Sequence, residues 1–227
     1  FILYGYELLH EGSKKAVPLL AIFISLAFFC GHVQELYYLL LFLTGSIVIE
    51  SLVAIWQSRK INEPGQSGSM ELEKTGSPGV WLKGWLLAGL ITAGLVAIDL
   101  IPVFVYTKQA VRSGGIDLRA LNDGSLNGAS LLQLIDPFVW GKPDRYSGPG
   151  IFYWEAICSF GCLPLLLAVT GAVTSFRQRS VIRLTLIGLV AFLLAFGPGL
   201  PIYSLFYKLI PGASMFRIPG RQMWICS

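Results

Sequence analysis

The chain has 227 residues, of which 54% are hydrophobic and 13% are charged, and its formal net charge is +4. Soluble domains carry roughly 25% charged residues, so this composition predicts a membrane protein and argues against a soluble enzyme. The basic residues form no dense block of the kind that binds nucleic acid, and we expect no nucleic-acid partner.

The charged residues avoid four long apolar segments, residues 17–58, 85–106, 151–176 and 184–203. Together these segments contain four charged side chains, Glu35, Glu50, Asp99 and Glu155. This distribution is expected when apolar helices lie in lipid and their connections lie in water.

In chain order, the apolar runs predict five membrane-spanning helices, because about 20 apolar residues cross the hydrocarbon core. The expected spans are about 16–30, 36–56, 85–106, 152–176 and 183–197. The predicted fold class is all-α, a polytopic transmembrane helix bundle with extracytoplasmic loops. We expect residues 1–227 to form a single transmembrane domain and a fragment of a longer protein, because the chain begins with Phe1 and ends within a new apolar run.

Two polar loops separate these spans. Lys and Arg near the span ends are retained on the cytoplasmic side, and Lys14, Arg59 and Arg177 fall on one face if five spans alternate. Loop 57–83 is therefore expected to be cytoplasmic and loop 107–150 extracytoplasmic. We expect the outer loop to fold partly over the external surface, with a short interfacial helix at residues 130–135.

The first polar candidates lie at a tight outer turn between two spans. His32 and Gln34 could hydrogen-bond a sugar hydroxyl or a phosphate, or they could satisfy the backbone groups of the turn itself. Glu35 could orient His32 or be a solvated acid at the membrane interface.

Three further acids lie within expected spans, where an unpaired charge costs about 2.5 to 3.5 kcal/mol on insertion scales. Asp99 precedes Pro102 and could line a polar cavity or pair with a neighbouring helix. Glu50 lies near enough to the cytoplasmic end of its span for partial hydration. Glu155, beside Tyr and Trp, could bind a sugar hydroxyl or a cation, or simply face lipid headgroups.

Two arginines stand at the outer end of the chain's last polar segment. Arg217 and Arg221 are four residues apart in a segment where prolines limit backbone freedom, and guanidinium groups bind phosphate oxygens bidentately. The pair could hold a lipid phosphate, or the two side chains could anchor to bulk headgroups.

No metal site is predicted. Cys158 and Cys162 share a helical face, but two thiols in an apolar span without a nearby His or acid are more typical of packing than of metal binding. No cofactor is firmly implied, and a divalent metal is left open.

Several short motifs together resemble a known family. They are Gly31-His32-Val33-Gln34, Asp136-Pro137 with Gly141, Tyr146-Ser147-Gly148, Tyr153-Trp154-Glu155, Leu163-Pro164-Leu165-Leu166, Gly197-Pro198 with Pro201 and Tyr203, and Pro211-Gly212 through Phe216-Arg217, Pro219 and Arg221. In order and rough spacing they resemble the YfhO-type bacterial membrane proteins, a branch of a polytopic group similar to the GT-C glycosyltransferases.

The resemblance implies a multi-pass protein of the bacterial cell (inner) membrane that moves a sugar from a polyprenyl-phosphate donor to an extracytoplasmic cell-envelope acceptor. Membrane lipids, the lipid-linked donor and the acceptor would be its partners. Arg217 and Arg221 would bind the donor phosphate, and His32, Gln34, Glu155 and Tyr146 would line the sugar pocket. The catalytic residue is unknown, because the family's acid would lie upstream of Phe1.

Two other function classes stay open. A membrane transporter or lipid flippase would use Asp99 and Glu50 as pathway residues. A non-catalytic envelope-assembly protein would tolerate loss of Arg217 or His32.

Overall fold

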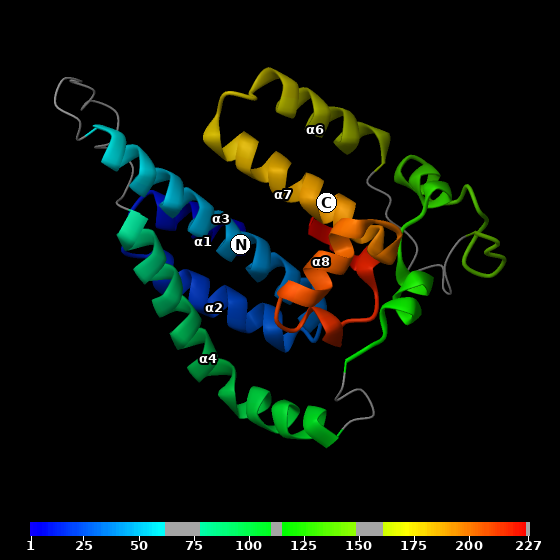
Figure 1. The fold of residues 1–227 in the computed structure, drawn as a ribbon, viewed down its shortest axis with the longest axis horizontal. Helices are drawn as coiled ribbons and strands as arrows, with labels where there is room; N and C mark the ends of the chain where they lie inside the picture. The colour runs from blue at the N-terminus through cyan, green and yellow to red at the C-terminus, as the bar shows by residue number, and fades with distance from the viewer. Residues whose placement is uncertain (62–77, 110–114, 149–160, 226–227) are drawn as a thin grey trace. The chain divides into compact units, whose positions relative to one another are not determined.

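The computed structural model describes residues 1–61, 78–109, 115–148 and 161–225 (Figure 1). Within these ranges the chain is helical and contains no strand, which confirms the all-α class. The contacts divide the chain into two compact units, residues 1–108 and 109–227, called unit 1 and unit 2 below.

The described residues of unit 1 form four helices that follow one another in sequence. They are α1 (Ile2–His10), α2 (Ala16–Phe29), α3 (Val33–Ile61) and α4 (Pro78–Gln109). The turn between α2 and α3 passes through Gly31 at a φ of 85°, a left-handed conformation that glycine adopts without the strain of a Cβ. The amides of Cys30 and Gly31 bond to the last carbonyls of α2, so the turn satisfies the helix end locally.

The core of unit 1 comes from one side of each helix. Its buried members are Ile2, Tyr6, Leu9, Ala16, Leu20, Ile24, Leu36, Leu43, Ile47, Trp85 and Ala88. In α4 the residues Trp81, Trp85, Ala88, Thr92 and Val96 are buried, at intervals of three and four residues. This helical spacing places them on a single stripe that faces the other helices of the unit.

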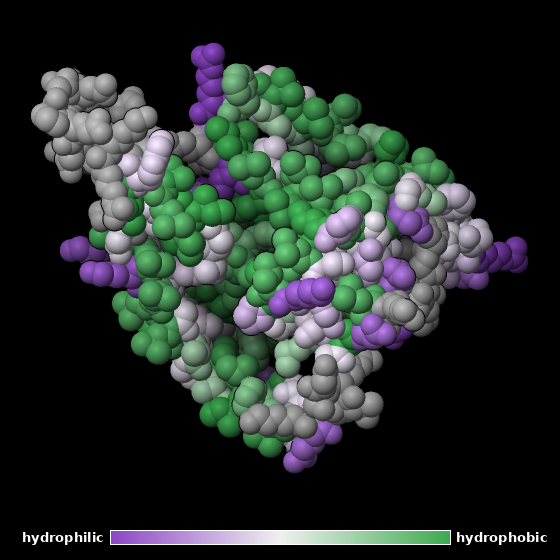
Figure 2. Space-filling model, viewed as in Figure 1, coloured by the Kyte–Doolittle hydropathy of each residue, from purple (hydrophilic) through white to green (hydrophobic). Residues whose placement is uncertain are grey.

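Two helices are long and apolar enough to cross a membrane, over Val33–Trp56 in α3 and Gly79–Thr107 in α4. Only 22% and 17% of their most apolar windows are buried. The core helix of a soluble protein would be mostly buried, and Figure 2 shows apolar side chains over the exposed surface of α4. This exposure favours a lipid environment. Pro102 lies within α4, which bends along its length in Figure 1, as expected where proline removes a helical hydrogen bond.

The helices at the other expected spans are shorter. α2 has 14 residues, α6 (Cys162–Thr174) has 13 and α7 (Arg179–Ala195) has 17. A helix rises about 1.5 Å per residue, so each is shorter than the roughly 30 Å hydrocarbon core. The first part of the expected span 152–176 lies outside the described residues. Five complete spans therefore stay a prediction.

Unit 2 combines helices with short turns of 3-10 helix. Its elements are η1 (Leu118–Gly124), η2 (Gly128–Leu134), α6, α7, η3 (Gly197–Gly199), α8 (Pro201–Leu209), η4 (Ala213–Met215) and η5 (Pro219–Ile225). α6 and α7 lie side by side, and η5 packs along α7. A short helix does form where residues 130–135 were expected to be helical; Asn127 caps it by accepting from the amide of Ser130.

Backbone hydrogen bonds join loop 107–150 to the C-terminal segment of unit 2. The amide of Leu126 donates to the carbonyl of Ala195 over 2.8 Å, and the amide of Ile116 donates to the carbonyl of Ser214 over 2.9 Å. The Tyr207 hydroxyl donates to the carbonyl of Ile116. The described part of loop 107–150 is therefore bound to residues about 70 to 100 positions later in the chain.

Gly197 is the tightest junction in this arrangement. It is buried at a φ of 56°, and a Cβ there would collide with the Ser125 hydroxyl and lie 3.1 Å from the Pro219 ring. Gly124 is similarly close, because its Cβ would lie 3.0 Å from the Cα of Ile218. The absence of side chains at these two positions lets the three segments meet.

Gly197→Ala should therefore destabilise the protein by about 2 kcal/mol or more, from left-handed strain and the Ser125 contact together. Gly199→Ala is the matched control, since a Cβ at that exposed position meets nothing within 4 Å. Thermal unfolding of both variants, followed by circular dichroism in detergent, measures the difference. Equal melting temperatures for the two variants would contradict this account of the junction.

Candidate functional site

The turn between α2 and α3 presents one of the predicted polar groups to the outside. His32 is 76% exposed, and its Nδ1 lies 3.6 Å from Oε2 of Glu35, which is 19% exposed. Glu35 is thus positioned to orient the imidazole. Gln34 is buried and donates from Nε2 to the Tyr38 hydroxyl over 3.3 Å. Of this group, His32 is the side chain that an external ligand reaches first.

Glu50 belongs to a polar chain that crosses from α3 to α1. Its Oε1 accepts from the Ser46 hydroxyl over 3.1 Å, and that hydroxyl lies 2.7 Å from the hydroxyl of Tyr6. Its Oε2 lies 3.5 Å from Nδ1 of His10. Four polar side chains of two apolar helices therefore contact one another.

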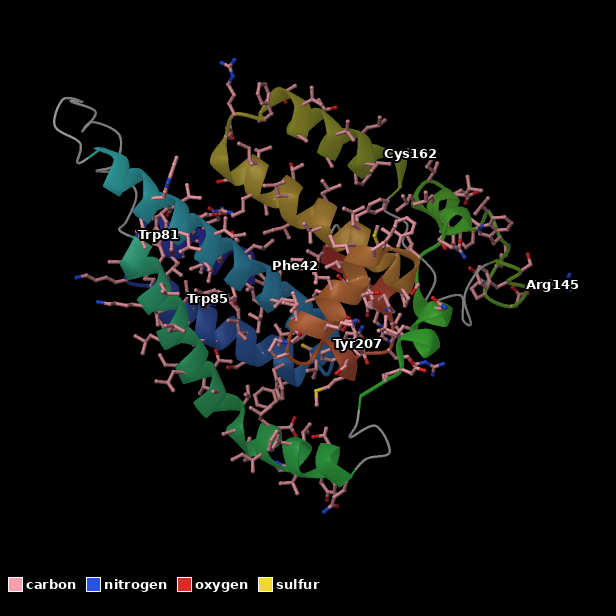
Figure 3. All side chains as sticks on the ribbon, in the orientation of Figure 1. Phe42, Trp81, Trp85, Arg145, Cys162 and Tyr207 are labelled. Carbon is pink, nitrogen blue, oxygen red and sulfur yellow. The ribbon has the colours of Figure 1, made fainter. Side chains whose placement is uncertain are left out.

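Aromatic rings surround the imidazole at the end of this chain. The ring centroid of His10 lies 4.7 Å from that of Tyr6 and 4.6 Å from that of Trp81 on α4. Figure 3 shows Trp81 and Trp85 on the side of α4 that faces the other helices of unit 1. The sequence interpretation missed His10 and Tyr6. Their spacing was the available signal, because Tyr6/His10 and Ser46/Glu50 are both polar pairs four residues apart.

Asp99 lies on the exposed side of α4. Its neighbours Ile98 and Leu100 are exposed as well. A cavity of about 290 Å³ does open in unit 1, but its walls are mostly hydrocarbon and Asp99 does not line it. Its lining residues are Ile24, Phe28, Leu36, Leu40, Thr44, Trp85, Gly89, Thr92, Ala93, Val96 and Leu100. A polar wall formed by Asp99 thus stays a prediction.

The two arginines lie on the segment of unit 2 that packs against η1. The Arg217 side chain is exposed and that of Arg221 is half-buried. The Arg217 carbonyl would lie 3.3 Å from a Cβ at Gly124, and the Gly124 carbonyl would lie 3.0 Å from a Cβ at Gly220. The amide of Arg221 donates to the carbonyl of Ile218 over 3.2 Å. Close backbone contacts therefore fix the segment that carries both guanidinium groups.

The remaining sugar-pocket candidates lie in or after the outer loop. Tyr146 is half-buried, and its hydroxyl would lie 2.6 Å from a Cβ at Gly148. Arg145 beside it is exposed and extends from the loop in Figure 3. Glu155 lies outside the described residues. His32 and Gln34 belong to unit 1, whereas Tyr146, Arg217 and Arg221 belong to unit 2.

Two buried amides in unit 2 were not anticipated. Gln133 and Gln222 are each 0% exposed, and neither the amide nitrogen nor the amide oxygen of either has a hydrogen-bond partner among the described residues. Gln222 follows Arg221 directly and precedes Met223, which packs in a small cluster with Leu126 and Ala195. Sequence patterns gave no signal for them, since a Gln in a polar loop is ordinarily solvated.

No metal centre is evident in the part of the chain that the structure describes, where no three His, Cys, Asp or Glu side chains gather. Cys162 and Cys30 are exposed free thiols, and Cys158 lies outside the described residues. Comparison with known proteins adds no assignment, because no protein-family model, no curated protein and no solved structure matches this chain.

The buried amide of Gln222 generates a stability prediction. An unsatisfied buried polar group costs about 1 to 3 kcal/mol, so the apolar replacement Gln222→Met should raise the free energy of unfolding by about 1 kcal/mol. Gln178→Met, at an exposed position, should change it by less than about 0.5 kcal/mol. Chemical denaturation in detergent measures both. Marked destabilisation by Gln222→Met would instead reveal a bound partner for this amide.

Proposed function

We propose that the chain is part of a glycosyltransferase of the bacterial inner membrane, which moves a sugar from a polyprenyl-phosphate donor to an extracytoplasmic cell-envelope acceptor. The observation that carries the proposal is the fixed segment bearing Arg217 and Arg221. Membrane lipids, the lipid-linked donor and the acceptor are the proposed partners.

The chemistry of sugar transfer explains why such a segment suits the donor. When the glycosidic bond to phosphate breaks, negative charge develops on the leaving phosphate oxygens. A guanidinium binds two such oxygens in one plane and keeps its positive charge at any physiological pH. Donors that are already positioned stabilise this charge without reorganising, and the contacts of the Arg217 backbone with Gly124 supply such positioning.

The proposed membrane location is supported by exposed apolar residues in the same unit as the two arginines. Leu132, Ile135, Phe138 and Val139 are all 40% exposed or more within the outer loop. Hydrocarbon side chains on a polar loop suit a membrane surface. We therefore propose that residues 131–140 lie on the lipid, on the same unit as Arg217 and Arg221, where a lipid-linked phosphate would be presented.

The proposal also assigns four side chains to the sugar pocket. His32 is exposed and held near Glu35, so it is available to a sugar hydroxyl. Gln34 would first have to leave the Tyr38 hydroxyl. Tyr146 and Glu155 complete the proposed set, and no residue of the chain is assigned as the catalytic acid.

A transporter or flippase is the second candidate, favoured by the contacts of Glu50. Buried chains of acids, imidazoles and hydroxyls within apolar helices are typical of proton and ion pathways. Glu50, Ser46 and His10 form such a chain in unit 1. A non-catalytic role in envelope assembly is the outcome that remains if neither activity is found.

The decisive experiment deletes the gene and complements it with wild type or with Arg217→Ala/Arg221→Ala at matched membrane expression. Mass spectrometry of the envelope glycans should show one sugar lost in the deletion strain. The double variant should restore it at least tenfold less well than wild type, because a charge-assisted hydrogen bond contributes about 1.5 to 3 kcal/mol.

Lys208→Ala/Arg145→Ala is the matched control, since it removes two exposed cations of the same unit and should restore the sugar fully. An unchanged glycan profile in the deletion strain would overturn the glycosyltransferase proposal. Full restoration of the sugar by the Arg217→Ala/Arg221→Ala variant would show that the two arginines are not required for donor binding.

A further inference from the structure

A buried imidazole and a half-buried carboxylate meet inside unit 1, and neither residue was used above for sugar transfer. Nδ1 of His10 lies 3.5 Å from Oε2 of Glu50, and these side chains are 10% and 29% exposed. His10 ends α1, and Glu50 lies within the apolar segment of α3. Two titratable groups are thus placed together where water is scarce.

Burial restricts the protonation states that this pair can adopt. An isolated carboxylate or an isolated imidazolium in a low-dielectric environment loses several kcal/mol of hydration energy. One proton placed between the two groups gives either a compensated ion pair or two neutral partners, and both states avoid a lone buried charge. The paired arrangement is therefore favoured over either isolated charge.

Two hydroxyl groups extend the carboxylate into α1. Ser46 donates to Oε1 of Glu50 over 3.1 Å, and the Tyr6 hydroxyl lies 2.7 Å from the Ser46 oxygen. Hydroxyl groups donate and accept in turn, so this chain can reverse its direction when the charge on Glu50 changes. The hydrogen-bonded path runs from Tyr6 to Glu50, and the other oxygen of Glu50 lies 3.5 Å from Nδ1 of His10.

Residues from three helices surround the His10 imidazole. Glu50 approaches it from α3, Tyr6 packs against it from its own helix, and α4 contributes the Trp81 ring. Glu50 thus places a carboxyl against His10, and Tyr6 places a phenol there. Lys83 on α4 is exposed.

We propose that His10, Glu50, Ser46 and Tyr6 form a proton-binding site inside unit 1. Neutral His10 holds its proton on Nδ1, toward the Glu50 carboxylate. A proton from solvent adds to Nε2, which gives an imidazolium that faces the carboxylate, and the Ser46 and Tyr6 hydroxyls hydrogen-bond in series to the other carboxylate oxygen. The new N–H bond is the one covalent bond that forms in the protein.

The site is independent of the glycosyltransferase proposal, because it contains none of the residues assigned to donor or sugar. It gives the second candidate function a chemical basis, since a proton held within apolar helices is what a proton-coupled carrier requires.

The chain contains two histidines, which makes a direct test practical. Nitrogen-15 labelling of histidine, with the full chain in lipid bilayers, yields NMR signals of His10 and His32 that His32→Gln assigns. The pH is varied between about 4 and about 9 to bracket imidazole titration. Glu50→Gln should lower the proton affinity of His10 at least tenfold, because an anion within about 4 to 6 Å favours the cation by that much.

His32 and Glu35 are the matched control within the same molecule, since they are 3.6 Å apart but the imidazole is 76% exposed. Glu50→Gln should leave the His32 signals unchanged. A His10 proton affinity equal within threefold in wild type and Glu50→Gln would overturn the proposal.

The wild-type protein provides a second test that does not depend on a variant's folding. Neutral His10 should carry its proton on Nδ1, facing Glu50, and the nitrogen shifts distinguish the two tautomers. A neutral His10 protonated on Nε2 alone, or a His10 that never changes protonation over the titration, would also overturn the proposal.

Discussion

Hydrogen bonds between polar side chains of α4 and the neighbouring helices constrain how unit 1 packs. The Trp85 indole donates to the Thr44 hydroxyl over 3.0 Å, and the Thr92 hydroxyl donates to the Ala21 carbonyl over 3.4 Å. Successive residues of a helix point about 100° apart. A rotation of α4 by one residue would break both bonds, so these bonds fix which stripe of α4 faces inward.

Unit 2 is organised by close backbone contact instead. Hydrogen bonds between distant main-chain groups join the outer loop to the segment after α7, and small residues allow the approach. An exposed arginine on such a segment differs from one on a free tail, because less conformational entropy is lost when it binds an anion. The proposed proton-binding site therefore lies in unit 1, whereas the two arginines proposed to bind phosphate lie in unit 2.

Local sequence patterns predicted the elements of this fold better than its contacts. The apolar run after Lys15 correctly located α2. The break after it was expected over residues 31–35, but α3 already begins at Val33, so Gln34 and Glu35 lie in its first turn. The contact between the two polar pairs could not be predicted, because Tyr6 and Ser46 are 40 residues apart and the spacing within each helix does not show that the helices meet there. Among the candidate site residues, Glu35 was placed beside His32 as one of two alternatives, whereas the buried environment of Gln222 depends entirely on tertiary packing.

The glycine junction of unit 2 has an evolutionary consequence. Leu, Ile, Val and Phe can replace one another at exposed apolar positions with little effect on stability. The sequences of apolar helices can therefore change while their hydrophobic character is kept. Position 197 has no such freedom, since its left-handed backbone and the Ser125 contact both exclude a side chain. Distant homologues that share this unit should retain glycine at positions 124 and 197 and vary at 199. In an alignment of related chains, these two glycines, about 70 residues apart, should therefore be better conserved than the hydrophobic segments.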